Sequence, residues 1–192
     1  MGDGGGTIQY SATLPGTWRR HAGKLRRSAE FLWAPLAHAL TLQPPFSDDD
    51  VALWDHCYAF LLVAGASLEA MIKAAAIQAH MNVDGFRRVV RPDGQMERWL
   101  TVHNLVALAD RANISLADGE REPLERFEKY VVWAGSYPTS KNLVTDRPDA
   151  GLQFDFNVSD YDWTWFERLY NKAEDRYQQD LAARRARVQG GE

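Results

Sequence analysis

The stretch of sequence that decides the fold, residues 54–80, reads WDHCYAFLLVAGASLEAMIKAAAIQAH. Its apolar and small residues recur at alternating steps of four and three, at Trp54, Tyr58, Leu61, Gly65, Leu68, Ile72 and Ala75. This spacing places them along one face of an α-helix. From Ala59 to Leu68 the segment is apolar almost all round, which is typical of a buried helix. Ser47 and Asp50 have capping-box spacing, so we predict one central helix from about Asp48 to His80.

This apolar run is not expected to cross a membrane. Its most apolar part, Cys57–Leu68, is too short to span a bilayer, and Glu69 and Lys73 follow at once. The first residues contain no apolar run, so no signal peptide is expected. The single cysteine cannot form a disulfide within the chain and is expected to be a reduced core thiol. These features together predict a cytoplasmic protein.

Further helices are predicted on both sides of the central one. Apolar residues at helical spacing indicate them at Thr17–Leu40, Thr101–Ala112, Asp118–Ala134 and, capped by Ser159, up to about Val188. The sequence therefore predicts an all-α bundle of about five helices. Residues 1–16 are glycine-rich and are expected to form a flexible tail, with residues 17–188 as a single helical domain.

One long irregular loop is predicted before the last helix, from Gly135 to Asp160. A loop of this length in a compact domain is often functional. Tyr137, Lys141 and Arg147 lie in it. Their aromatic and cationic side chains make them candidate ligand-binding residues.

The charge balance limits the class of function. The chain has 22 basic and 26 acidic residues and a net charge of −4, which argues against a protein whose whole surface binds nucleic acid. A local basic patch is still compatible with this total. Five basic residues crowd the first half of the first helix: Arg19, Arg20, Lys24, Arg26 and Arg27. Cations oppose the helix dipole there, although a solvated face with amphipathic stems is the ordinary interpretation.

The start of the last helix is rich in aromatic residues. Five of the ten residues from Tyr161 to Tyr170 are aromatic. They are interpreted either as a core anchor or as a stacking platform for bases. This segment and the small residues from Ala64 to Ser67 are also the candidate surfaces for a two-fold homodimer.

Most common catalytic and cofactor motifs are absent from the sequence. It has no phosphate-binding glycine loop, no dinucleotide fingerprint and no zinc-ligand spacing, so neither a cofactor nor a metal is expected. The remaining candidate catalytic pair is Arg98 and His103, which four residues separate. An imidazole can transfer protons near neutral pH, and a guanidinium can bind a scissile phosphate. The alternative for His103 is a capping or core role at the start of a helix.

Two segments resemble HEPN domains. His103-Asn104-Leu105, followed by Val106-Ala107-Leu108-Ala109, is similar to the His-Asp-Leu helix start that is common in that family. Tyr130 to Pro138 resembles the family's helix end, where an Arg-Tyr-Pro triplet closes the last turn. A basic first helix and a long apolar second helix precede them in the same order. The resemblance covers about Ala52 to Pro138.

The resemblance implies a helical bundle that dimerises. Some HEPN domains are metal-independent RNases with an Arg, four to six residues and a His, which matches only Arg98 and His103 here. Others are inactive partners of nucleotidyltransferases, and many belong to bacterial toxin–antitoxin or defence systems. The leading hypothesis is a non-catalytic or accessory module with a nucleotidyltransferase or RNA as partner. A metal-independent endoribonuclease and a plain interaction scaffold are the alternatives.

Overall fold

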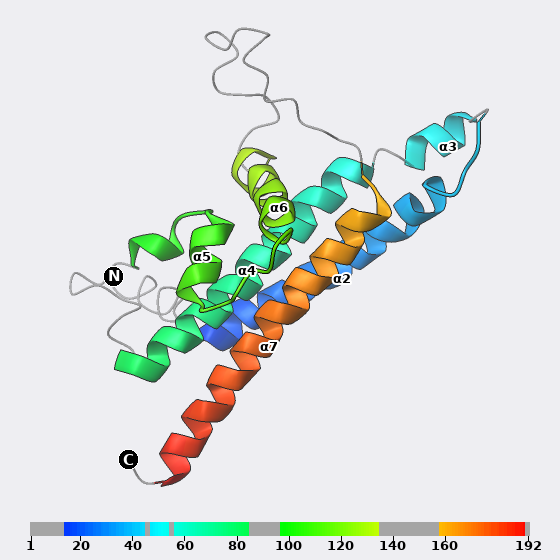
Figure 1. The fold of residues 1–192 in the computed structure, drawn as a ribbon. Helices are drawn as coiled ribbons and strands as arrows, with labels where there is room; N and C mark the ends of the chain where they lie inside the picture. The colour runs from blue at the N-terminus through cyan, green and yellow to red at the C-terminus, as the bar shows by residue number, and fades with distance from the viewer. Residues whose placement is uncertain (1–13, 45–46, 54–55, 85–96, 135–157, 191–192) are drawn as a thin grey trace, which may run out of the picture.

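The computed structural model describes residues 14–44, 47–53, 56–84, 97–134 and 158–190. These residues form six α-helices and one short 3-10 helix and contain no strand (Figure 1). The predicted fold class, an all-α bundle of about five helices, is confirmed. Residues 1–13 of the predicted tail and residues 135–157 of the predicted loop lie outside the described residues.

Helix α4 (His56–Asp84) is the centre of the bundle. Helices α2, α5, α6 and α7 all pack against it (Figure 1). Leu61 and Leu68 have no exposed surface, and every residue from Ser67 to Ala79 is buried. The prediction that this helix is the most buried is therefore confirmed. Cys57 is also buried, as expected.

The prediction of one helix from Asp48 to His80 is wrong, because the structure has two. Helix α3 (Asp48–Leu53) is separate from α4, and residues 54–55 lie outside the described residues. Helix α3 packs on α2, a contact that helical spacing alone does not predict. The capping box is confirmed: the Ser47 amide donates to the Asp50 carboxylate at 2.8 Å, and the Asp50 amide donates to Ser47 Oγ at 3.2 Å. These Ser47 hydrogen bonds hold the pKa of Asp50 below its usual value.

Two long helices run alongside α4. Helix α2 (Pro15–Ala39) begins two residues earlier than predicted, because a proline at the first helical position has a suitable φ and no amide to leave unpaired. Pro15 and Gly16 thus belong to the bundle and not to the tail. Helix α7 (Asp160–Gly190) follows Ser159, whose amide donates to the Asp162 carboxylate at 2.9 Å. From residue 182 onward α7 is exposed and extends beyond the other helices (Figure 1).

Two shorter α-helices cover one side of α4. Helix α5 (Leu105–Arg111) is shorter than predicted because the Asn104 side chain caps it, accepting a hydrogen bond from the Ala107 amide at 2.7 Å. The 3-10 helix Arg98–Leu100 precedes it. Helix α6 (Arg121–Ala134) begins three residues later than predicted. Gly119 before it has φ of 84°, a left-handed conformation that suits a turn.

The small residues of α4 are used inside the chain. A Cβ atom on Gly65 would lie 2.7 Å from Val131 Cγ2 and 2.9 Å from the Phe127 carbonyl oxygen, so this glycine lets α6 approach α4 closely. Ser67 Oγ donates to the Ala22 carbonyl of α2 at 3.0 Å. The prediction that Ala64–Ser67 is a dimer surface is therefore corrected: Ala64, Gly65 and Ser67 are buried by the chain's own helices.

The aromatic start of α7 is chiefly a core anchor. Trp163 stacks on Trp33 of α2 with ring centres 5.7 Å apart and planes 11° apart. Phe166 is fully buried and meets Phe60 of α4 edge-on at 6.5 Å. Tyr161 and Trp165 are the exceptions. The surface of Tyr161 is 74% exposed, and the Trp165 ring lies 5.2 Å from the Arg168 guanidinium and lines a surface hollow. The core interpretation of this segment fits three of its five aromatic side chains, Trp163, Phe166 and Tyr170, better than a stacking platform does.

Helix α4 also has the length and composition of a membrane-spanning helix. Its apolar window within His56–Met81 has a mean hydropathy of 1.8 and is longer than the most apolar part, Cys57–Leu68, on which the expectation from the sequence rests. Ala70–Ala79 continues the apolar run beyond Glu69 and contains Lys73 as its one charged residue. In the bundle, 83% of this window is buried.

Candidate functional site

Two charged residues lie within the apolar length of α4. Glu69 and Lys73 are one helical turn apart, and their carboxylate and ammonium groups form an ion pair. Only 9% and 3% of these side chains are exposed. The Lys73 ammonium also lies 5.2 Å from the ring centre of Trp18 on α2, where the ring face favours a cation. Each of these buried charged groups thus has a compensating partner beside it, as burial of a charge requires.

His103 is the third member of this group. It lies between the 3-10 helix and α5, and its Nδ1 is 3.1 and 3.0 Å from the two oxygens of Glu69. An ionised carboxylate can only accept hydrogen bonds, so Nδ1 is the donor in this pair. Half of the His103 side chain, 51%, is exposed. We name Glu69, Lys73 and His103 the polar cluster.

Arg98 belongs to a different environment. Its neighbours Trp99 and Leu100 are buried, and Trp99 packs on the His80 ring at 5.2 Å. The Arg98 carbonyl accepts a hydrogen bond from Thr101 Oγ1 at 2.8 Å, and its side chain is exposed. The structure therefore joins His103 to α4 through Glu69. Among the described residues, no hydrogen bond or ion pair links the Arg98 side chain to His103 or to Glu69.

Sequence reasoning missed Glu69 and Lys73 as members of the site. The available signal was a Glu–Lys pair at i and i+4 inside an otherwise apolar helix, where a buried charge needs a partner. That the partner includes His103, 34 residues further on, depends on how α5 docks on α4. The other predicted site residues, Tyr137, Lys141 and Arg147, lie outside the described residues.

A second buried carboxylate joins the start of α6 to α7. Glu120 has no exposed surface; its Oε2 accepts from the Ala117 amide at 2.6 Å and from Lys172 at 2.5 Å. Arg168 Nε lies 2.8 Å from Oε1. Burial alone would raise the pKa of Glu120, but Lys172, the Ala117 amide and Arg168 together hold that pKa below its usual value. This arrangement keeps the carboxylate ionised and fixes two helices together.

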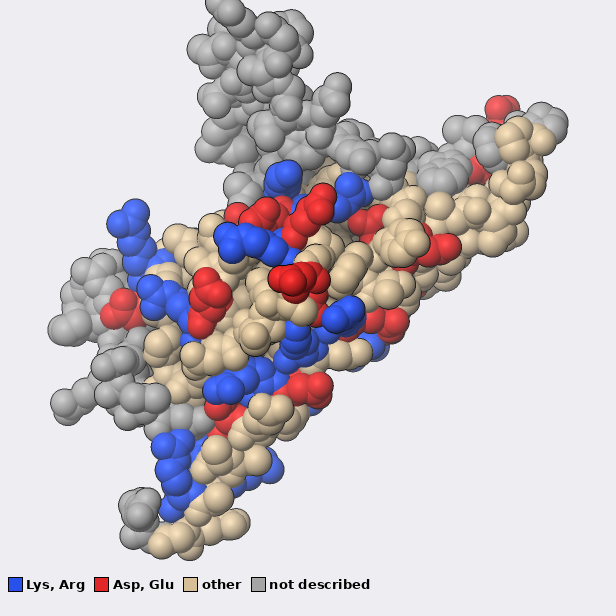
Figure 2. All heavy atoms as spheres, viewed as in Figure 1, with Lys and Arg blue, Asp and Glu red and all other residues tan. Residues whose placement is uncertain are grey.

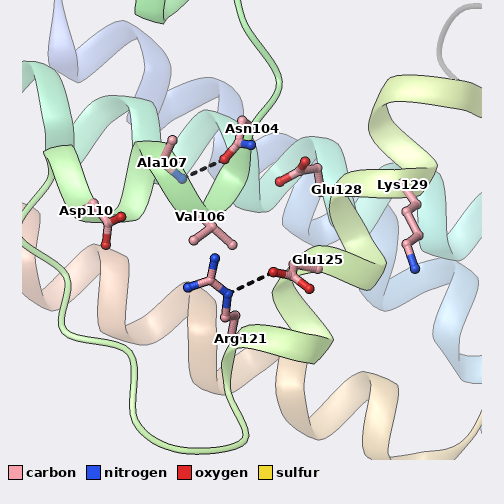
Figure 3. Close-up of a pocket in the computed structure, with 8 residues that line it drawn as sticks. All are labelled: Asn104, Val106, Ala107, Asp110, Arg121, Glu125, Glu128 and Lys129. Atoms are coloured by element: carbon pink, nitrogen blue, oxygen red, sulfur yellow. Dashed lines mark hydrogen bonds and ion pairs between the residues drawn. The ribbon is translucent and has the colours of Figure 1, made fainter.

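The surface between α5 and α6 is hollowed over about 400 Å³ (Figure 3). Side chains of both signs line it: Asp110, Glu125, Glu128, Arg121 and Lys129. Arg121 and Glu125 are paired at 2.9 Å, and Glu128 is bound to the Leu105 amide at 2.8 Å. Many of the charged side chains that line this hollow are thus already bound to other groups of the chain.

Acidic and basic groups also alternate over α6 and α7 on the face shown in Figure 2. Among the described residues, no group of three or more histidine, cysteine, aspartate or glutamate side chains is placed to hold a metal ion. Comparisons with protein-family models, with curated proteins and with solved structures found no match for this chain.

Proposed function

We propose that this chain is a HEPN-like helical module that serves as a non-catalytic, accessory component of a nucleotide- or RNA-linked bacterial system, of the toxin–antitoxin or defence type. The observation that carries the proposal is the bond between His103 and the buried Glu69–Lys73 pair. This bond holds the segment before α5 on α4. The hydrogen bond to Glu69 therefore gives His103 a structural role, and His103 is the residue that catalysis would need most.

The surroundings of Arg98 support the same proposal. In the RNases of the HEPN family, a polar residue follows the catalytic arginine. Here Trp99 stands in that position, and its ring is buried between His80, at 5.2 Å, and the Arg111 guanidinium, at 5.5 Å. Ser136 also stands where the family's Arg-Tyr-Pro triplet has its arginine. Both departures favour a member that has lost, or never had, the catalytic pair.

We also propose that the module works as a homodimer and binds a nucleotidyltransferase or RNA. With Ala64, Gly65 and Ser67 buried, the start of α7 is the remaining candidate surface for association. Tyr161 is exposed there beside a hollow of about 490 Å³ that α6 and α7 share. An exposed aromatic beside a hollow is typical of contact surfaces.

The test is incubation of single-stranded RNA with the purified chain in EDTA, analysed on a denaturing gel. We expect the RNA to remain intact even with protein in excess. His103→Ala and Arg98→Ala should leave that result unchanged, and His103→Ala should lower the unfolding temperature while Arg98→Ala should not. Cleavage that both variants abolish would contradict the proposal.

A second candidate, a metal-independent endoribonuclease, is favoured by the exposure of the His103 ring. With Nδ1–H bound to Glu69, Nε2 would take the proton of an RNA 2′-hydroxyl, as a carboxylate-oriented imidazole does in other enzymes. Arg98 would bind the scissile phosphate. This function requires Glu69→Gln to reduce cleavage as well, because the carboxylate would orient the base. The three variants therefore separate the two candidates.

A further inference from the structure

The basic residues of α2 fall into two groups with different surroundings. Arg19 and Arg26 face α7: Arg19 Nε is 2.7 Å from Glu174, and an Arg26 nitrogen is 3.5 Å from Glu167. Their guanidinium groups also lie over the rings of Tyr177 and Tyr170, at 5.5 and 4.8 Å. These two arginines are therefore part of the packing between α2 and α7.

The other group lies on the outer face of α2. Arg20, Lys24 and Arg27 are exposed and follow one another at steps of four and three, which aligns them along the helix. They lie opposite the buried residues Ala22 and Ala29. No acidic side chain among the described residues forms an ion pair with any of the three; Arg20 only donates to Thr17 Oγ1, at 3.4 Å.

The next position of the same alignment is occupied by an exposed aromatic ring. Phe31 follows Arg27 by four residues, and 78% of its surface is exposed. We name Arg20, Lys24, Arg27 and Phe31 the α2 stripe; the helical rise over the eleven steps from Arg20 to Phe31 makes it roughly 16 Å long. The nearby acid Glu30 is bound to Arg26 at 3.1 Å and does not neutralise the stripe.

We propose that the α2 stripe binds a single-stranded polynucleotide, with Arg20, Lys24 and Arg27 on the phosphates and Phe31 stacked on a base. Proteins that bind single strands combine a track of cations with aromatic rings that accept any base. Three cations that pair with no acid in the described part of the chain, in line with one exposed ring, supply both parts. The choice of RNA over DNA rests on the proposed function, whereas the choice of a single strand rests on the stripe itself.

An anionic membrane fits the stripe less well. Phe31 is the stripe's one apolar side chain, whereas binding at a lipid surface needs a broad apolar face. The net charge of −4 and the acids of α3, which packs on α2, would oppose a flat anionic surface. A narrow charged polymer can follow a line of cations without approaching those acids.

The test is fluorescence anisotropy with a labelled 20-nucleotide RNA of mixed sequence, titrated with the full chain in EDTA. A variant with Arg20→Gln, Lys24→Gln and Arg27→Gln should bind at least tenfold more weakly, and the slope of log Kd against log salt should fall by about 2, at roughly 0.7 for each lost phosphate contact. Phe31→Ala should weaken binding about fivefold or more. Because all four side chains are exposed, unfolding temperatures should stay within a degree or two of the parent.

The matched control is Arg184→Gln with Arg185→Gln and Arg187→Gln, which removes the same charge from the exposed end of α7. We expect it to weaken binding less than threefold. Equal losses of RNA affinity in the two triple variants would overturn the assignment to α2, and so would unchanged binding in the α2 variant. Binding of phosphatidylserine vesicles in place of RNA would overturn it as well. Equal affinity for a duplex would contradict single-strand binding, and a DNA arm tests the choice of RNA.

Failure here can be distinguished from failure of the proposed function. If the chain binds no polynucleotide and cleaves none, the assignment of the α2 stripe is wrong and a non-catalytic scaffold remains. A chain that binds through the stripe and also cleaves RNA through His103 overturns the non-catalytic role alone.

Discussion

Single residues in this chain show how buried charge is kept compatible with an apolar core. Glu69 is paired with Lys73 and His103, and Glu120 is paired with Lys172 and Arg168. Glu120 is more buried than both of its cationic partners, and Glu69 is more buried than His103. Removing one partner would leave an uncompensated buried charge, which lowers the free energy of unfolding.

The substitution Glu120→Gln tests this at the more fully buried group. We expect the free energy of unfolding to fall by about 1–3 kcal/mol, because two cations lose their anion and the Ala117 amide loses a charged acceptor. Glu125→Gln, on the adjoining helix α6, is the matched control: it pairs with Arg121, and 46% and 69% of these side chains are exposed. Urea denaturation should show less than about 0.5 kcal/mol for the control.

Acid should act on the same residue. The pKa of Glu120 is lower in the folded chain than its ordinary value of 4.5, so the unfolded chain binds the proton more readily. The stabilisation is therefore complete above about pH 4.5 and is lost as pH falls through the folded pKa. Unfolding temperatures measured from pH 7 to pH 3 should fall less steeply for Glu120→Gln than for the parent. Parallel curves would show that this carboxylate does not supply the acid sensitivity.

At the scale of helices, close contact between α4 and α6 depends on Gly65. The substitution Gly65→Ala should destabilise by about 1–3 kcal/mol, because the new methyl would meet Val131 Cγ2 at 2.7 Å and the Phe127 carbonyl at 2.9 Å. Gly23→Ala is the control with the opposite sign. Its Cβ would meet no atom of another residue closer than 4.0 Å, so the better helix propensity of alanine should stabilise by about 0.5–1 kcal/mol. Equal effects in thermal unfolding would show that Gly65 does not set this contact.

The helices were predictable where periodicity or a cap decided them. The seam through Leu61 and Leu68 predicted the central helix, and Ser47 and Ser159 marked helix starts correctly. Periodicity could not show that α3 packs on α2, since helical spacing describes one segment at a time and not the contact between two helices. The candidate site was half predictable for the same reason: His103 was found from its motif, but its tie to Glu69 exists only once α5 docks on α4.

At the scale of the whole molecule, two-fold association is the prediction. A chain of 21.7 kDa should give a light-scattering mass of about twice that value at micromolar concentration. Tyr161→Ser should shift it towards the monomer, because this exposed ring lies on the remaining candidate surface. The control is Phe31→Ser, which removes an exposed aromatic ring from α2 and should leave the mass unchanged. Tyr58 on α4 is only partly exposed and is therefore a less suitable control. A parent that stays monomeric at 100 μM, a concentration chosen for the assay, would contradict dimerisation.

We propose that the chain binds RNA and does not cleave it. The most direct measurement is an overnight incubation of end-labelled single-stranded RNA with excess protein in EDTA, followed by native and denaturing gels of the same sample. We expect slower migration on the native gel and one full-length band on the denaturing gel. Shortened RNA from the parent, together with full-length RNA from His103→Ala, would contradict it.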